Sequence, residues 1–182
     1  MQVSYVGDLC FKLRGNKINV LVGFSPNALK IKPEIVVSTN KVDRSYIVNS
    51  EPKPFIIDAP GEYEITDVSV FGKGKIYTIE IDDIKVGYIG ELTEALTNEQ
   101  IEEINGVELL IIPLGKENLN IGQAVKAVNQ IQPKLLIIPP QEQSNSFLKE
   151  LGQEEAKKET RLTVSKILLP EEMETIILEQ NG

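Results

Sequence analysis

The side chains best placed to do chemistry follow one buried-looking strand. The apolar run Ile35–Val37 leads into the polar stretch Ser38–Ser45, and α/β proteins commonly present site residues at the carboxyl end of such a strand. The chemically capable side chains after Thr39 are Asn40, Lys41, Asp43, Arg44 and Ser45. The pattern predicts a site whose available groups are an amide, two cations, a carboxylate and a hydroxyl.

Histidine is absent from the whole chain. Imidazole is the commonest transition-metal ligand and the usual general base near neutral pH. The composition therefore excludes a Ser-His-Asp triad, a Cys-His pair and a histidine-based zinc site. Cys10 is the only cysteine, and without a base beside it we expect a small buried hydrophobe. Any catalysis would have to use carboxylates, lysine, tyrosine, hydroxyls, the single thiol or backbone amides.

Composition indicates one acidic globular domain over residues 1–182. A chain of 182 residues suits a single domain, which buries about 70% of its unfolded surface. The net charge of -8 and the pI near 4.8 disfavour binding to nucleic acid or to an anionic membrane. Residues 1–5 lack the basic region and the long apolar run of a signal peptide. No apolar run approaches the roughly 18 residues that a membrane helix needs, so we expect a cytoplasmic protein with no membrane span.

Strand signals dominate the first half of the chain. Period-two alternation, apolar runs and turn residues predict two strands in 2–14 with a kink at Gly7-Asp8, a loop over 23–33, and strands over 17–22, 34–38 and 55–58. A turn and a strand follow in 59–65, then two strands over 68–81 across the short turn 72–74, and a strand over 84–91. Glu62 and Glu64 alternate with Tyr63, which predicts that both carboxylates face outward.

Strands alternate with helices in the second half. The capping box Thr97–Gln100 predicts a helix that ends at Gly106, and Asn120 caps a second helix that Pro133 stops. Buried strands are expected over 107–112 and 134–138, a short helix over 143–153, an exposed charged segment over 154–159, and closing strands over 162–169 and 175–179.

The loop at 39–45 resembles the Thr-His-x-His-x-Asp-His segment of the metallo-β-lactamase superfamily. In that pattern the two leading histidines, the aspartate and the last histidine correspond to Asn40, Val42, Arg44 and Ser45. The segment Asp58–Glu64, which reads Asp-Ala-Pro-Gly-Glu-Tyr-Glu, is similar to a stretch of the ascorbate-6-phosphate-lactonase-like branch. The resemblance covers nearly the whole chain and implies an αββα sandwich of two mixed sheets flanked by helices.

Further positions of the family's metal site are also altered. The resemblance places Asp8 where the family has a histidine and Glu91 where it has a metal-binding aspartate. Either Pro140 or Gln141 stands in place of the final histidine ligand. The short turn around Lys73 replaces a longer connection that usually carries another histidine. The implied cleft therefore lacks its zinc ligands, and we expect no zinc and no other cofactor.

Two classes of function remain open at this point. The first is a catalytically inactive pseudo-hydrolase that serves as a binding or scaffold protein, through a protein partner or as a homo-oligomer. The second is a hydrolase of small lactone-like or phosphorylated substrates with a carboxylate-based Mg²⁺ or Mn²⁺ site, drawn from Asp8, Asp43, Glu91 and Glu142. Val42 and Arg44 weigh against it, because one offers no donor atom and the other is a cation. The acidic charge disfavours a nuclease role.

The loss of a dication would leave acidic side chains facing one another in the cleft. A planar guanidinium can hold a carboxylate at two points. We therefore predict that Arg44 or Lys41 points into the former metal cavity and pairs with Glu91 or Asp8. The alternative is that both cations are solvated loop charges.

Overall fold

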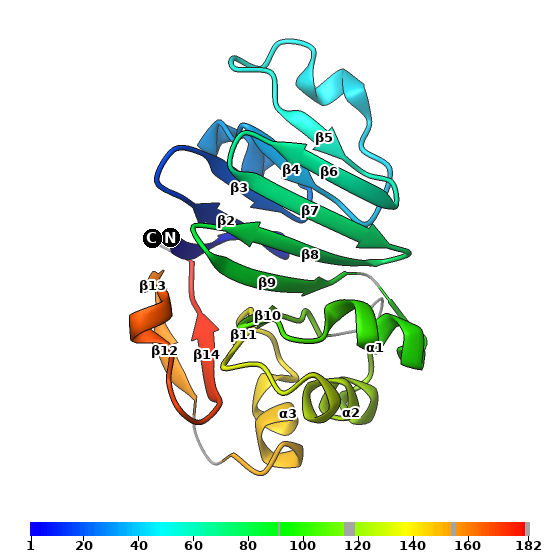
Figure 1. Ribbon diagram of the computed structural model, residues 1–182, viewed down its shortest axis with the longest axis vertical. Helices are drawn as coiled ribbons and strands as arrows, with labels where there is room; N and C mark the ends of the chain where they lie inside the picture. The colour runs from blue at the N-terminus through cyan, green and yellow to red at the C-terminus, as the bar shows by residue number, and fades with distance from the viewer. Residues whose placement is uncertain (91, 115–118, 154–155, 181–182) are drawn as a thin grey trace.

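Two mixed β-sheets lie face to face, with helical segments on their outer sides (Figure 1). The computed structural model describes residues 1–90, 92–114, 119–153 and 156–180. The six-stranded sheet has the order β13-β1-β2-β3-β4-β5, with strands β1 (Gln2–Gly7), β2 (Cys10–Arg14), β3 (Asn19–Val22), β4 (Ile35–Val37), β5 (Phe55–Ile57) and β13 (Leu162–Thr163). β1, β2 and β3 pair antiparallel, whereas β3, β4 and β5 are parallel.

The eight-stranded sheet has the order β12-β14-β11-β10-β9-β8-β7-β6. Its strands are β6 (Gly61–Ile65), β7 (Val68–Lys73), β8 (Ile76–Ile81), β9 (Ile84–Ile89), β10 (Leu109–Ile111), β11 (Leu135–Ile138), β12 (Lys157–Glu159) and β14 (Glu174–Leu178). β6 to β9 form an antiparallel meander. The other strands, β10, β11, β12 and β14, pair in parallel. β10 and β11 are wholly apolar and buried, as expected for strands covered on both faces, whereas the edge strand β12 is charged and exposed.

Three helices cover part of the outer face of the eight-stranded sheet. They are α1 (Asn98–Ile104), α2 (Ile121–Ile131) and α3 (Ser144–Glu150). The capping box of Thr97 and Gln100 is present, and Asn120 and Gln123 form a second one, so the predicted helix starts are confirmed. None of the helices in the described ranges is long and apolar enough to cross a bilayer.

The core between the sheets consists of the inward-facing residues of both, such as Phe11, Ile79 and Ile137. A second cluster lies between the eight-stranded sheet and the helices. On the far side, the 3-10 helix η1 (Pro26–Ile31) packs on the six-stranded sheet through Ala28. The predicted αββα sandwich is therefore confirmed.

Three local predictions are wrong or incomplete. The expected loop over 23–33 contains η1, because Pro26 starts a helical turn and Lys32 ends it in the left-handed region. The expected exposed segment over 154–159 contains β12, which gains its order from pairing with β14; residues 154 and 155 lie outside the described residues. The expected strand over 162–169 is only β13, followed by the 3-10 helix η3 (Lys166–Leu168).

Candidate functional site

The loops that follow β3, β4 and β10 meet the β1–β2 turn at one edge of the sandwich. They enclose a cleft of about 230 Å³ lined by Asp8, Leu9, Gly23, Phe24, Ser38, Thr39, Asn40, Lys41, Tyr88 and Pro113. Two of the predicted site residues, Asp8 and Asn40, are thus brought together. The close packing of the loop behind the cleft requires Gly90, since a Cβ there would lie 2.1 Å from Thr39 Cγ2.

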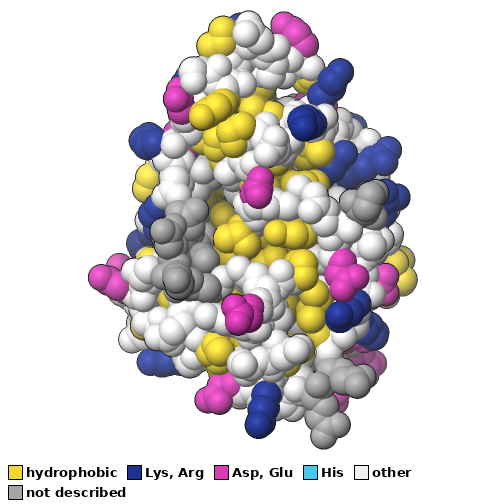
Figure 2. Space-filling view, turned by 180° about the vertical axis from the view of Figure 1, so that it is seen from behind, with side chains coloured by type: hydrophobic (Ala, Val, Ile, Leu, Met, Phe, Trp, Pro, Cys, Tyr) yellow, Lys and Arg dark blue, Asp and Glu magenta, His cyan; other side chains and the backbone are white. Residues whose placement is uncertain are grey.

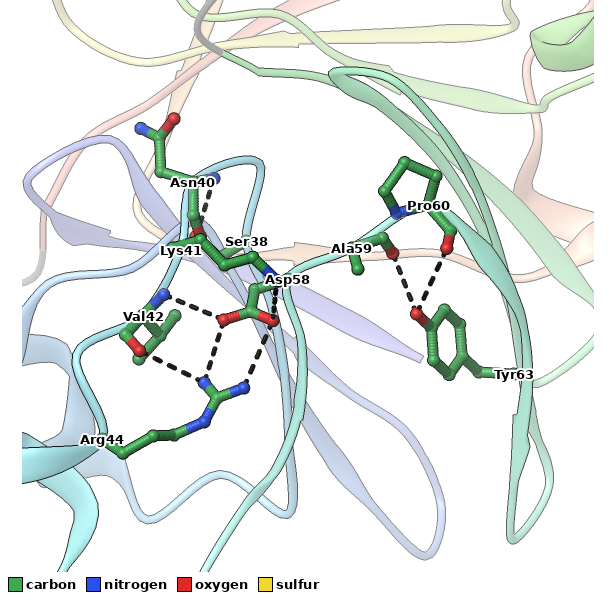
Figure 3. A network of polar contacts seen from close by, with 9 residues as sticks. All are labelled: Ser38, Asn40, Lys41, Val42, Arg44, Asp58, Ala59, Pro60 and Tyr63. Atoms are coloured by element: carbon green, nitrogen blue, oxygen red, sulfur yellow. Dashed lines mark hydrogen bonds and ion pairs between the residues drawn. The ribbon is translucent and has the colours of Figure 1, made fainter.

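Arg44 and Val42 do not face this cleft; both engage Asp58, which directly follows β5 (Figure 3). Arg44 lies in the 3-10 helix η2 (Arg44–Ile47). Its Nη1 lies 3.0 Å from Asp58 Oδ2 and its Nη2 donates to Oδ1 at 3.2 Å. The Val42 amide donates to Oδ2 at 2.9 Å, and Lys41 Nζ lies 3.5 Å from Oδ1. Val42 stands at a position that the resemblance assigns to a metal ligand, but its side chain is apolar and only 6% exposed.

The electrostatics of Asp58 follow from these contacts. Its side chain is 6% exposed, and burial opposes ionisation. The Val42 amide, the Arg44 guanidinium and the Lys41 ammonium outweigh that effect, so the pKa of Asp58 is lowered from its usual 3.8. The carboxylate therefore stays charged near neutral pH and fixes the path of the loop after β4.

Asn40 contacts a cation that sequence reasoning missed. The Nζ of Lys75, from the turn between β7 and β8, donates to Asn40 Oδ1. The backbone beside it is held by Ser38, whose Oγ donates to the Asn40 carbonyl at 2.8 Å. The shortened turn around Gly74 was visible in the sequence, but its contact with residue 40 depends on how the two sheets are stacked. An ammonium group thus reaches a position that the resemblance assigns to a metal ligand.

Asp8 is also engaged inside the protein. Its Oδ2 accepts a hydrogen bond from Ser25 Oγ at 2.7 Å. The neighbouring Cys10 is fully buried, and burial together with the charge of Asp8 raises the pKa of its thiol to about 12. Cys10 is therefore no thiolate nucleophile at neutral pH, and the expectation of a small buried hydrophobe is confirmed.

The remaining predicted positions have structural roles. The Ser45 amide donates to Asp43 Oδ1 at 2.9 Å and so starts η2. Gln141 accepts from the Leu114 amide at 2.8 Å and donates to the Leu114 carbonyl, joining the loops after β10 and β11. Glu91 lies outside the described residues.

The predicted partner of the loop cations needs correction. Neither Arg44 nor Lys41 forms an ion pair with Asp8; both pair with Asp58. The physical reason is the parallel pairing of β4 with β5, in which Val37 lies opposite Ile57. This register places Asp58 beside the start of the loop, where the backbone amide of Val42 also reaches it. The half of the prediction that concerns Glu91 lies outside the described residues.

The donor set does not fit a zinc ion. The described residues contain no group of three carboxylate or thiol side chains close enough to hold a metal ion, and the chain has no imidazole. Asp8, Asp43 and Glu142 do not form such a group either. An apolar side chain at position 42, an ammonium beside Asn40 and an amide at Gln141 are poor partners for a dication.

The sandwich, with its cleft at the loop edge, has the metallo-β-lactamase fold. A family model described as the beta-lactamase superfamily domain matches residues 2–140. The chain therefore belongs to this superfamily. No curated protein sequence matches it.

Solved structures similar to this chain share the fold at low sequence identity. A protein of Thermotoga maritima, described as a Zn-dependent hydrolase of the metallo-β-lactamase superfamily, is 21% identical with a TM-score of 0.81, and the match covers 98% of this chain and 99% of that one. The metallo-β-lactamase fold protein YhfI of Bacillus subtilis is 11% identical with a TM-score of 0.61, over 96% and 95%. Igni18, a metallo hydrolase of Ignicoccus hospitalis, is 15% identical with a TM-score of 0.59, over 83% and 90%.

Proposed function

We propose that this protein is a catalytically inactive pseudo-hydrolase that serves as a binding or scaffold protein. The observation that carries this function is the use of former metal-site positions for internal contacts. Asn40 accepts from Lys75, Arg44 holds Asp58, and Gln141 joins Leu114. At each of these positions, where the resemblance implies a metal ligand, this chain has a side chain that holds a loop in place.

The rest of the cleft supports binding better than catalysis. Its Asp8 carboxylate is engaged by Ser25, and the thiol behind it is buried with a raised pKa. The lining of the cleft also includes hydroxyl, amide and ammonium groups, which are chemically able to hydrogen-bond a ligand. We further propose that the protein is cytoplasmic, holds no zinc and acts through a protein partner or a second copy. Its net charge of -8 disfavours nucleic acid and membranes as its targets. The Asp58–Glu64 segment supports a place beside the ascorbate-6-phosphate-lactonase-like branch.

Metal content tests this function against the hydrolase alternative. The protein is purified without chelators, dialysed against Zn²⁺, Mn²⁺ or Mg²⁺ in turn, and assayed by elemental analysis and for hydrolysis of lactones and phosphate esters. We expect far less than one equivalent of metal, no turnover, and the same result for Asp8→Asn. One equivalent of metal that Asp8→Asn loses, with turnover that follows it, would establish the carboxylate-based hydrolase instead.

A further inference from the structure

The outer face of the eight-stranded sheet is covered by helices over only part of its width. On the covered part, side chains such as Ile89, Leu110 and Leu136 pack into the cluster beneath the helices. In the described part of the chain no helix lies over β6 and β7, which face the viewer in Figure 1. A hollow of about 440 Å³ occupies this uncovered region. The described helices thus cover the outer face of this sheet as far as α1 and leave β6 and β7 uncovered.

Strand alternation and register arrange the side chains of this region into two rows. One row consists of Glu62, Phe71 and Thr78. The other consists of Glu64, Ser69, Glu80 and Lys85. Phe71 is a half-buried aromatic between a carboxylate and a hydroxyl. We call this region, lined by both rows, the β6–β8 hollow.

The β6–β8 hollow carries an excess of negative charge. Glu62, Glu64 and Glu80 are exposed, and none of them forms an ion pair with a described residue. Lys73 at the rim is already engaged by Glu99 and Glu103 of α1. On the opposite side of the molecule, acidic side chains are spread over the surface among basic and hydrophobic ones (Figure 2). Phe71 on β7 lies between strands β6 and β8, which carry these glutamates. This arrangement suits a ligand that is apolar at its centre and cationic at its sides.

We propose that the β6–β8 hollow docks an amphipathic helix of a partner protein, with an apolar residue against Phe71 and lysine or arginine beside Glu62, Glu64 and Glu80. Such a helix would continue the layer that α1 begins, since helices cover the same face of the same sheet next to it. Binding in this mode uses anchors spaced three or four residues apart on one helix face. The inference gives a surface and a partner chemistry to the proposed binding role, and it rests on that role.

A second copy of this chain is a poorer occupant. Helix α1 carries Glu99, Glu102 and Glu103 and no lysine or arginine. Helices α2 and α3 carry one lysine each, Lys126 and Lys149. The lysines of the edge strand β12, Lys157 and Lys158, are already paired with Glu174 and Glu179. No described helix of another copy therefore presents a basic amphipathic face.

A designed peptide tests the β6–β8 hollow directly. The probe is a fluorescein-labelled helical peptide of about 16 residues, with leucines four positions apart on one face and lysines flanking them. Its matched control replaces each lysine with glutamate. Binding to the full chain is followed by fluorescence anisotropy at several salt concentrations. The protein variants are Glu62→Lys with Glu64→Lys, Phe71→Ala, and the control pair Glu142→Lys with Glu150→Lys, which makes the same charge change on exposed residues of the α3 region.

We expect saturable binding of the lysine peptide only, weakening with added salt. The Glu62→Lys, Glu64→Lys variant should lose at least about tenfold in affinity and Phe71→Ala several-fold, while the control pair should change little. Amide shift changes on peptide binding should lie in β6, β7 and β8. Circular dichroism confirms that each variant is folded.

Three results would overturn the docking surface: no saturable binding, equal loss in the control pair, or a dimer by light scattering that the Glu62→Lys, Glu64→Lys variant dissociates. The last result would show that a second copy of the chain occupies the β6–β8 hollow. Metal content and turnover test the cleft and do not involve the β6–β8 hollow. A negative peptide result is therefore distinguishable from failure of the proposed function.

Discussion

Arg44 holds Asp58 at two points, with Nη1 3.0 Å from Oδ2 and Nη2 3.2 Å from Oδ1. The carboxylate is almost fully buried and also accepts from the Val42 amide. In this protein the loop after β4 is therefore organised by an internal anion, where the family resemblance implies a bound cation.

Asp58→Asn should destabilise the protein by about 1–3 kcal/mol at neutral pH, because hydrogen bonds to a charged group are lost. The sign of the pH dependence follows from the lowered pKa of Asp58. Its contribution is complete above the unfolded value of 3.8 and is lost as the pH falls through the lower folded pKa. Urea unfolding at several pH values should show the difference between wild type and variant shrinking in acid. Asp67→Asn, which breaks an exposed pair with Lys17, is the control and should change little. A constant difference across pH would contradict the assignment.

Gln141→Ala should cost about 1–3 kcal/mol, because it removes both hydrogen bonds to the Leu114 backbone. The chain contains no tryptophan, so unfolding is best followed by far-ultraviolet circular dichroism. Gln143→Ala is a matched control, since the Gln143 side chain is exposed and makes no capping hydrogen bond. Equal stability of the two variants would show that the contact between the loops contributes nothing.

Gly90→Ala should destabilise the protein by about 1–3 kcal/mol through overpacking against Thr39. Gly122→Ala should do the opposite by roughly 0.5–1 kcal/mol, because the site near the start of α2 is open and alanine favours helix. Adding Thr39→Ala to Gly90→Ala should cost less than the sum of the single changes, and a double-mutant cycle measures this coupling. Strict additivity would mean that the two residues do not press on each other.

Sequence reasoning recovered most elements because their signals are local. Thr97 and Gln100 form a capping box within four residues, and Leu135–Ile138 is an apolar run of strand length. β12 was missed because Lys157–Glu159 has no apolar alternation. Its order comes from pairing with a strand that lies further along the chain, as Lys157 lies opposite Ile176 of β14.

The site was predicted in part for the same reason. The absence of histidine is a property of composition, so it needed no structure. The pairing of Arg44 with Asp58 was not predicted, because it depends on which residues the fold brings beside the loop. The parallel pairing of β4 and β5 decides it, and that pairing cannot be read from the loop alone. The contact between Lys75 and Asn40 could not be predicted from the sequence, because it joins the two sheets.

The sealed position of Cys10 has a practical corollary. A thiol-reactive dye in solution meets no sulfur until the end of β2 comes away from its neighbours, because the side chain is fully buried. Labelling then counts excursions of the native state and not collisions with its surface. The labelling rate of the native Cys10 therefore measures how often the structure opens locally at the edge of the cleft where Asp8 and Asn40 lie.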